Sequence, residues 1–202
     1  MTINKDRILS IGFGFSLIYW GVIGFFINYQ GWETPIVRLF ITLLNITVGI
    51  LILFRSPVIN YGSFSAVFMS LPSLLCGGLA FKLSKDLSNW GFIPICIFLL
   101  GGGITLISFL FLGKSFSVFP SLRGIVSKGS YRLVRHPSYF GELLMIIACL
   151  IATDYIFSWS ILLLFFPFII LRIEEEEKLL STSEEYISYS QKVTWRLIPL
   201  IW

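Results

Sequence analysis

The sequence predicts an all-α protein, a polytopic bundle of helices that cross a membrane. Hydrophobic residues make up 56% of its 202 residues and charged residues 13%, whereas about a quarter of an ordinary soluble domain is charged. Apolar runs of about 20 residues recur along the chain, and a helix of that length crosses the hydrocarbon core of a bilayer. We expect about four full spans, followed by a C-terminal helical hairpin whose flanking polar segments lie in the cytosol.

The four full spans are predicted from long runs with few or no charged side chains. They cover residues 8–27, 36–54, 62–81 and 90–112. The first run is too long for the core of a signal peptide, so we expect it to remain as a helix. Pro35 is expected at the start of the second span and Pro57 just after its end, because proline is tolerated in the first turn of a helix and ends a helix at later positions. Pro72 should kink the third span, and Trp90 should mark the membrane interface before the fourth.

Residues 143–171 form a fifth apolar stretch, in which Asp154 is the charged exception. The stretch is too long for one span and too short for two full ones, so a tight helical hairpin is the simplest arrangement. A hairpin returns both of its ends to the same side of the membrane. We therefore expect the polar segments before and after it to lie within one helix diameter, about 10 Å, of each other.

The segment before the hairpin, residues 113–140, is basic and rich in turn-forming residues. Its basic side chains are Lys114, Arg123, Lys128, Arg132, Arg135 and His136, interspersed with Pro120, Gly124, Gly129 and Pro137. This composition predicts an ordered loop at the membrane interface. The segment after the hairpin begins with Arg172 and continues into four consecutive glutamates at 174–177.

The distribution of lysine and arginine predicts the side that these segments face, because positively charged loops stay in the cytosol. With a cytosolic N-terminus, all of the cations fall on the cytosolic side except Arg38, Lys82 and Lys85. We therefore predict a multi-pass integral membrane protein with both termini in the cytosol. The plasma membrane is the simplest location for so short a chain.

Several other classes of protein or site are disfavoured. The net charge of +4 does not indicate nucleic-acid binding, since the basic residues are not clustered on a water-exposed surface. Cys76, Cys96 and Cys149 lie far apart in apolar runs, so we expect them to be buried and to form neither a metal site nor a disulfide framework. The glycines at 101–103 lie among large apolar residues, which favours close helix packing over a phosphate loop.

Three blocks in the polar segments carry a family resemblance. They are G-x-Y-x-x-x-R-H-P-S-Y-x-G at 129–141, R-x-E-E-E-E at 172–177 and E-E-Y-x-x-Y-x-x-x-V at 184–193. In this order and at these separations, the sequence resembles the isoprenylcysteine carboxyl methyltransferase family, which shares a superfamily with phospholipid N-methyltransferases. The resemblance covers residues 126–199. It makes residues 113–202 the expected catalytic region and residues 1–112 the expected membrane-spanning part.

The resemblance implies a binding site for S-adenosylmethionine. The residues that it places in the wall of this site are Ile125, Val126, Tyr131, His136, Pro137, Ser138 and Tyr139. It also implies that Glu176 holds the cofactor and that Arg172, four residues earlier and on the same helical face, faces the methyl acceptor. Arg172 and Glu176 are thus the expected catalytic pair.

The expected reaction depends on position more than on a reactive side chain. Methyl transfer from a sulfonium is an in-line displacement. Holding the donor and the acceptor in contact therefore lowers the activation free energy by about 7 to 11 kcal/mol. An acceptor carboxylate is already ionised and needs only charge pairing, which the fork of Arg172 provides. We therefore expect methylation of the carboxylate of a lipid-like, isoprenylcysteine-type acceptor that reaches the cytosolic face from among the membrane lipids.

Three other functions stay open on the sequence. A phospholipid amine would have to lose a proton before methylation, which calls for a general base. An NADPH-dependent membrane reductase is a further alternative, because integral membrane sterol reductases show some likeness in the C-terminal region. A helical membrane module that recruits a partner through its polar loops is the non-enzymatic alternative.

The candidate residues also have purely structural interpretations. A run of four glutamates is typical of a solvated helix face, and a lone histidine beside proline, as at His136, is usually structural. Arg132 and Arg135 suit anchors for anionic lipids, and Tyr186, Tyr189 and Trp195 suit an interfacial aromatic belt. Glu142 lies just inside the hairpin, where a carboxylate is a functional candidate or pairs with Arg135.

Overall fold

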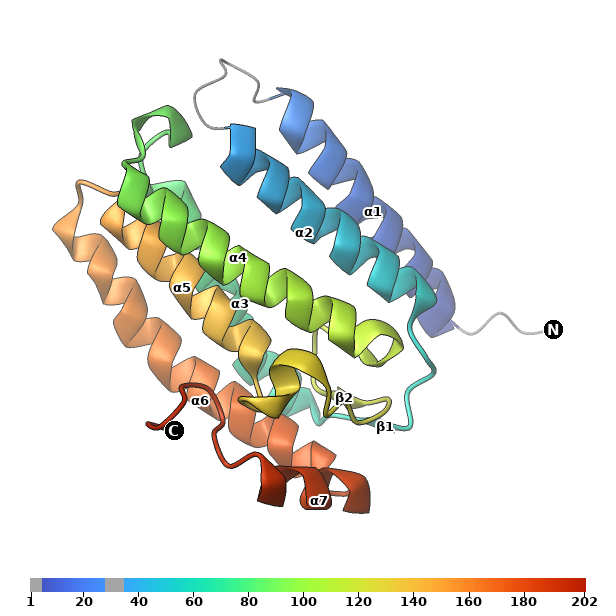
Figure 1. Cartoon of the computed structure of the whole chain (residues 1–202). Helices are drawn as coiled ribbons and strands as arrows, with labels where there is room; N and C mark the ends of the chain where they lie inside the picture. The colour runs from blue at the N-terminus through green and yellow to red at the C-terminus, as the bar shows by residue number, and fades with distance from the viewer. Residues whose placement is uncertain (1–4, 28–34) are drawn as a thin grey trace.

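The computed structural model of the protein describes residues 5–27 and 35–202, which form a bundle of long helices (Figure 1). The α-helices are α1 (Lys5–Ile27), α2 (Pro35–Phe54), α3 (Phe64–Leu83), α4 (Phe92–Leu112), α5 (Pro137–Ile151), α6 (Ser160–Leu180) and α7 (Glu184–Lys192). The 3-10 helices are η1 (Leu87–Asn89), η2 (Gly113–Ser115), η3 (Gly129–Arg132) and η4 (Ile156–Trp159). Antiparallel pairing of β1 (Asn60–Tyr61) with β2 (Ser121–Leu122) ties the loop after α2 to the loop after α4. The predicted all-α membrane bundle is confirmed.

Four helices in the described part of the chain are long and apolar enough to cross a membrane. They are Ile36–Phe54, Phe64–Leu83, Phe92–Ser115 and Ile156–Leu180. The described apolar part of α1, Ser10–Phe26, is shorter, and so is α5. Among the helices that are described along their whole length, the long spans are α2, α3, α4 and α6, and the C-terminal hairpin joins the shorter α5 to the full span α6.

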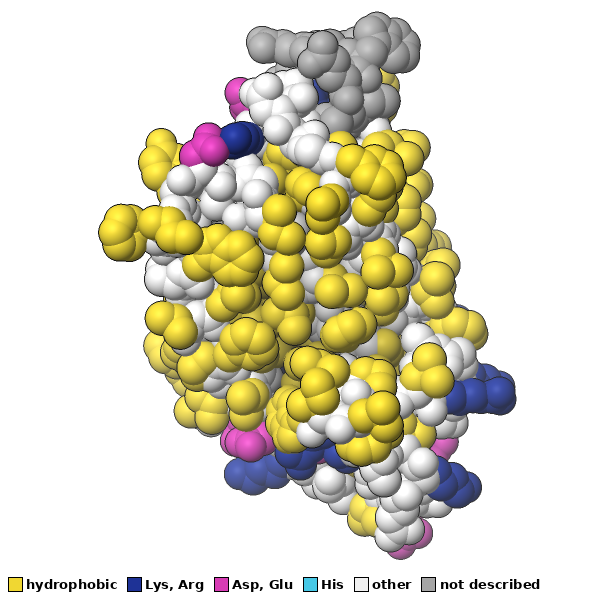
Figure 2. All heavy atoms as spheres, turned by 60° about the vertical axis from the view of Figure 1, so that its left-hand side comes forward, with side chains coloured by type: hydrophobic (Ala, Val, Ile, Leu, Met, Phe, Trp, Pro, Cys, Tyr) yellow, Lys and Arg dark blue, Asp and Glu magenta, His cyan; other side chains and the backbone are white. Residues whose placement is uncertain are grey.

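The surface of the bundle separates apolar from charged side chains. In Figure 2, hydrophobic side chains cover the middle of the molecule, while acidic and basic side chains gather toward its two ends. Many of the exposed side chains are large and apolar, among them Phe13, Phe68, Leu75, Phe92 and Leu163. An apolar belt of this kind matches the hydrocarbon core of a bilayer. The chain is therefore an integral membrane protein.

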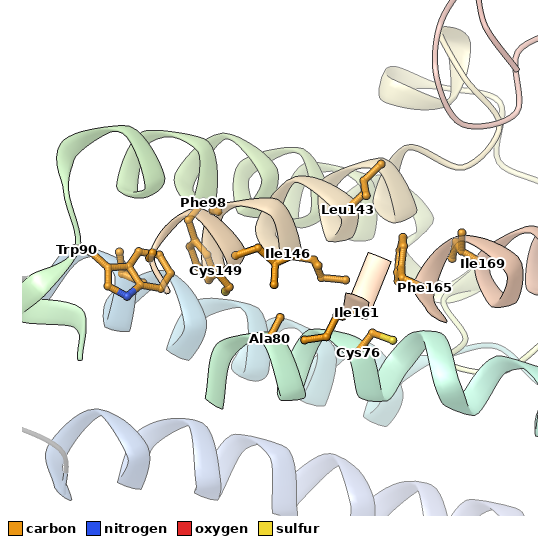
Figure 3. Packing of buried hydrophobic residues seen from close by; sticks show 14 of the residues in the cluster. Cys76, Ala80, Trp90, Phe98, Leu143, Ile146, Cys149, Ile161, Phe165 and Ile169 are labelled. Carbon is orange, nitrogen blue, oxygen red and sulfur yellow. The ribbon is translucent and has the colours of Figure 1, made fainter. Parts of the chain in front are cut away.

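A hydrophobic core joins α3, α4, α5 and α6 (Figure 3). Cys76 of α3, Phe98 of α4, Cys149 of α5 and Phe165 of α6 all belong to this core and are almost completely buried. α5 packs on both α3 and α4, and α6 packs on α3. The core therefore fixes the start of α5 and the end of α6, which carry the predicted site residues.

Glycines bring α4 and α5 into close contact. A Cβ atom on Gly101 would lie 2.6 Å from the carbonyl oxygen of Gly141, which is too close for a side chain. The predicted packing role is confirmed for Gly101 and also for Gly102, whose Cβ would meet a ring of α2 at 3.0 Å. It is wrong for Gly103, since no described atom beyond its own helix lies within 4 Å of a Cβ there.

The hairpin predicted at residues 143–171 is present but longer than expected. α5 already begins at Pro137, inside the predicted loop, because proline is favoured in the first helical turn. α6 continues to Leu180 through the four glutamates, since glutamate and lysine are good helix formers outside the apolar layer. Asp154 lies in the turn between the two helices, and its carboxylate pairs with Lys85 at 2.8 Å.

The prediction that all three cysteines are buried is wrong for one of them. Cys96 is exposed on α4, whereas Cys76 and Cys149 are buried as expected. Hydrophobicity does not separate the two cases, because lipid tails accept an apolar side chain as readily as the protein interior does. Trp90 lies just before α4, as predicted, and its ring packs against Phe98 with ring centroids 5.6 Å apart.

Candidate active site

A cavity of about 400 Å³ lies between the helices, the basic loop (residues 113–136) and α7. Part of its wall is apolar and comes from the spans, including Leu44, Val48, Leu74 and Gly77. The rest is polar and comes from the basic loop, the start of α5, the end of α6 and α7. Its polar side chains include Tyr131, Arg135, His136, Ser138, Tyr139, Glu142, Arg172, Glu176, Tyr186 and Tyr189.

The end of the basic loop is bound to the C-terminal tail that follows α7. The backbone N–H groups of Arg135 and His136 donate to the carbonyl oxygens of Trp195 and Arg196, at 2.9 and 2.8 Å. These hydrogen bonds give partners to the backbone N–H groups of the two residues just before α5. The segment that carries the histidine is therefore held in place by residues about sixty positions later in the chain.

A turn at Gly129 precedes Tyr131, which lines the cavity. Gly129 has a φ of +60°, a backbone conformation that residues with a side chain rarely adopt, and it begins η3. The carbonyl oxygen of Tyr131 accepts a hydrogen bond of 2.7 Å from the Tyr189 hydroxyl. Burial, reinforced by the negative charge of Glu176, raises the pKa of Tyr131. Its hydroxyl is therefore a neutral hydrogen-bond donor at physiological pH.

Glu177 joins three basic side chains where the loop, α6 and the tail meet. Its carboxylate lies 3.1 Å from His136 Nε2, 3.3 Å from Arg135 Nη1 and 3.0 Å from Arg196 Nε. The glutamate side chain is only 8% exposed. A nearly buried carboxylate with such partners holds the three segments together, and its removal would leave positive charge uncompensated.

Tyr139 connects the start of α5 with the end of α6. Its ring stacks on the ring of His136 with centroids 5.4 Å apart, and the guanidinium carbon of Arg172 lies 4.3 Å from the ring centroid. Its hydroxyl donates to a carboxylate oxygen of Glu176. Arg172 and Glu176, one helical turn apart, therefore contact the same tyrosine, and both line the cavity.

Arg172 is buried beside the cavity, and its guanidinium contacts groups from three other segments. Its Nη2 donates to the carbonyl oxygen of Val118 at 3.1 Å, and its Nη1 lies 3.5 Å from Ser73 Oγ and 3.7 Å from a carboxylate oxygen of Glu142. Its Nε–H is buried and has no hydrogen-bond partner among the described residues. A spare donor on a buried guanidinium suits an anionic group of a ligand.

The two tyrosines of α7 form the wall on the side of the tail. Tyr186 and Tyr189 are buried, with ring centroids 5.8 Å apart, and they cluster with Tyr131. Burial, together with the charge of Glu177, raises the pKa of Tyr186, and burial also raises the pKa of Tyr189. The interpretation of Tyr186 and Tyr189 as part of an interfacial belt is therefore wrong.

The structure brings most of the predicted site residues to this cavity. The predicted residues in its wall are Ile125, Val126, Tyr131, His136, Ser138, Tyr139, Arg172 and Glu176. Pro137 is not among the wall residues, because it is buried in the first turn of α5. The predicted pairing of Glu142 with Arg135 is wrong, since Glu142 pairs with Arg172, and Arg135 pairs with Glu177. The binding roles of the wall residues stay predictions.

Sequence patterns do not identify several further residues of the site. Glu177, rather than Glu176, contacts His136, and a run of identical residues contains no signal that distinguishes them. The apolar wall from α2 and α3 has no pattern of its own, because most residues of these two spans are apolar. Ser73 does leave a weak signal, because a polar side chain inside a predicted span must find a partner.

Comparison with known proteins assigns part of the chain to a family. The model of the isoprenylcysteine carboxyl methyltransferase (ICMT) family matches residues 95–182. A comparison with curated proteins finds no match. The matched segment contains His136, Arg172 and Glu176, whereas α2, α3 and α7 lie outside it. The match confirms the resemblance that the motif blocks indicate.

Proposed function

Since the model of the isoprenylcysteine carboxyl methyltransferase family matches residues 95–182, we propose that the chain transfers the methyl group of S-adenosylmethionine to the carboxylate of a lipid-like, isoprenylcysteine-type acceptor. This match and the membrane-spanning helices support a membrane methyltransferase. One observation carries the finer proposal: Arg172, with its unpaired Nε–H, borders a cavity that has both polar and apolar walls. A carboxylate on a hydrocarbon chain matches both features.

The side chains in the polar part of the cavity fit S-adenosylmethionine. The ammonium of this cofactor needs an anion, its carboxylate needs donors, and its ribose needs hydrogen-bonding partners. Glu176 supplies the anion, His136 supplies a ring nitrogen, and the hydroxyls of Tyr131 and Tyr186 are neutral donors. Residues 125–126 add apolar contact for the adenine. Ser138 and Tyr139 complete the proposed set.

The protein contributes position and charge to the reaction. When bound, S-adenosylmethionine supplies an electrophilic methyl group on a positively charged sulfur. Arg172 holds the acceptor carboxylate, while the Tyr139 ring and the Val118 carbonyl fix the plane of the guanidinium. No general base is required, because the carboxylate is already ionised.

The apolar part of the cavity suits the hydrocarbon chain of the acceptor. Leu44 and Val48 of α2 face it from one side, and Leu74 and Gly77 of α3 from another. α2 packs on α1 and α4, whereas α3 packs on α5 and α6, so two separately supported helices flank this part. We infer that the acceptor reaches the site from the bilayer between α2 and α3.

We place the polar end of the bundle in the cytosol and the protein in the plasma membrane, with both termini cytosolic. In support, the end of α2 is tied to the basic loop, since Ser56 N–H donates to the Lys114 carbonyl at 2.8 Å and Arg123 donates to the Ser56 carbonyl. This gathers cations at one end of the bundle, as expected for the cytosolic side. Residues 113–202, which include the span α6, act as the catalytic region, and residues 1–112 supply the other spans and the apolar wall from α2 and α3.

A labelling assay tests the carboxyl assignment. The purified protein in lipid nanodiscs receives labelled S-adenosylmethionine together with S-farnesylcysteine or phosphatidylethanolamine. We expect label in the prenylcysteine that alkali releases as methanol, because methyl esters hydrolyse in alkali and N-methyl groups do not. Alkali-stable label confined to phosphatidylethanolamine would overturn the carboxyl assignment and favour amine methylation.

A further inference from the structure

Gly77 of α3 is a position in the apolar wall of the cavity that has no side chain. It lines the cavity, and a Cβ atom on it would meet no described atom of another helix within 4 Å. Gly101 differs, because its Cβ would lie 2.6 Å from the Gly141 carbonyl oxygen. Close helix packing therefore explains the glycine at 101 but not the glycine at 77. The missing side chain at position 77 instead leaves free space in the cavity.

Gly77 lies one helical turn beyond the group that holds the proposed acceptor carboxylate. Ser73, four residues earlier and on the same face of α3, places its Oγ 3.5 Å from Arg172 Nη1. Four residues of an α-helix rise by about 6 Å. A hydrocarbon chain that is attached to a head group at Arg172 and follows α3 away from the polar end therefore passes Gly77.

The other wall residues of this part of the cavity carry large apolar side chains. They are Leu74 of α3, Leu44 and Val48 of α2 and Met145 of α5. α2 packs on α1 and α4, whereas α3 packs on α5 and α6. Because the two helices have different packing partners, the side chains between them decide how wide the passage is. A glycine leaves the most room.

We propose that Gly77 is a specificity-determining residue, which makes the passage wide enough for the methyl branches of an isoprenoid chain. The inference rests on the proposed function and deepens it, because it assigns recognition of the chain to one position of the apolar wall. An isoprenoid chain carries methyl branches at regular intervals and is thicker than an unbranched alkyl chain of the same length. At Gly77 the branches contact the backbone of α3, where a larger residue would fill the same space.

A side chain at position 77 should act on the acceptor chain and not on the cofactor. α3 carries none of the residues that are proposed to bind S-adenosylmethionine, which lie between 125 and 139 and at 176. One methylene in an apolar pocket changes discrimination between substrates by about 10- to 200-fold. A leucine side chain is larger than that, so it should exclude the branched chain strongly.

Two acceptors with the same head group test the inference. N-acetyl-S-farnesylcysteine and N-acetyl-S-dodecylcysteine share the carboxylate and the length of the main carbon chain, and they differ in the methyl branches and the double bonds. We would measure kcat/KM for both in lipid nanodiscs with the wild type, Gly77→Ala and Gly77→Leu. The farnesyl-to-dodecyl ratio should fall by about 10-fold or more in Gly77→Leu, and Gly77→Ala should lie between the two.

Gly78→Leu is the matched control. Gly78 is exposed on α3 outside the cavity wall, and its Cβ too would meet no described atom of another helix within 4 Å. The control adds the same side chain to the neighbouring residue of the same helix, so it shares any general effect of leucine on the helix. Both leucine variants should melt close to the wild type, and Gly78→Leu should keep the farnesyl-to-dodecyl ratio of the wild type.

Ligand binding separates an effect on the acceptor chain from a change in the fold. Isothermal titration of the two acceptors needs no turnover and should show the same loss of farnesyl selectivity in Gly77→Leu. Binding of S-adenosylhomocysteine should stay close to that of the wild type in both leucine variants. A parallel loss of cofactor binding in Gly77→Leu would show a general distortion of the site and overturn the assignment.

The failure of the inference is distinct from the failure of the proposed function. An unchanged farnesyl-to-dodecyl ratio in Gly77→Leu, or an equal fall in Gly78→Leu, would overturn the role of Gly77 and leave carboxyl methylation standing. Absence of an alkali-labile product from both acceptors with the wild type would remove carboxyl methylation itself.

Discussion

Replacement of Arg172 by lysine is expected to lower kcat/KM for the carboxyl acceptor by about 100-fold or more, which corresponds to about 3 kcal/mol. Lysine keeps the positive charge but loses the planar fork that contacts the Val118 carbonyl and the Tyr139 ring. Steady-state kinetics with labelled S-adenosylmethionine measure the loss. Binding of S-adenosylhomocysteine should stay close to that of the wild type, because Arg172 is assigned to the acceptor.

Arg132→Lys provides the matched control for this variant. Arg132 is exposed on η3 and is not part of the cavity wall, so its replacement should leave kcat/KM unchanged. Full activity in Arg172→Lys, or an equal loss in Arg132→Lys, would contradict the assignment of Arg172 to the acceptor carboxylate.

Substitutions of two neighbouring glutamates of α6 are expected to have different effects, one on ligand binding and the other on stability. Glu176→Gln should weaken binding of S-adenosylhomocysteine by about 10- to 100-fold, since a hydrogen bond to a charged group contributes about 1.5 to 3 kcal/mol. Glu177→Gln should lower the free energy of unfolding by about 3 kcal/mol, because Arg135 and Arg196 lose the anion that they share. Ligand titration and thermal melting measure the two effects.

Glu175→Gln is the control within the same run of glutamates. Glu175 lies 4.0 Å from the exposed Lys178 and is not part of the cavity wall, so neither binding nor melting should change. A loss of binding in Glu177→Gln without a change in melting temperature, or unchanged binding in Glu176→Gln, would contradict this division of roles.

The membrane fold follows from the sequence because the bilayer restricts what an apolar run can become. A run such as residues 36–54 has to form a helix, since its backbone groups find no water to bond inside the membrane. Helix ends are less constrained where the chain leaves the apolar layer. For this reason α5 and α6 extend past the predicted hairpin, into segments whose polar residues also favour helix.

The polar part of the site was predictable because its residues lie in short motif blocks at both ends of one hairpin. His136 and Glu176 therefore reach the same cavity. The contacts inside the cavity were less predictable. His136 pairs with Glu177, and Glu142 pairs with Arg172. Both pairings depend on how far each helix is rotated about its own axis, to within a fraction of a turn.

The apolar part of the site could not be predicted, because large apolar side chains are spread around α2 and α3 instead of marking one face. The packing of the helices decides which of their leucines face the cavity and which face lipid. Both environments favour apolar side chains, so the residue type does not distinguish them. The contact of Arg172 with the backbone of Val118 could not be predicted either. Its carbonyl oxygen orients Arg172, and a backbone carbonyl leaves no signature in the residue type.

The central claim is that the polar segments around His136 and Glu176 bind S-adenosylmethionine. Paired titration of the detergent-solubilised protein with S-adenosylhomocysteine and with NADPH tests it most directly. We predict saturable binding of S-adenosylhomocysteine and no saturable binding of NADPH. Tight binding of NADPH alone would contradict the claim and make the protein a reductase.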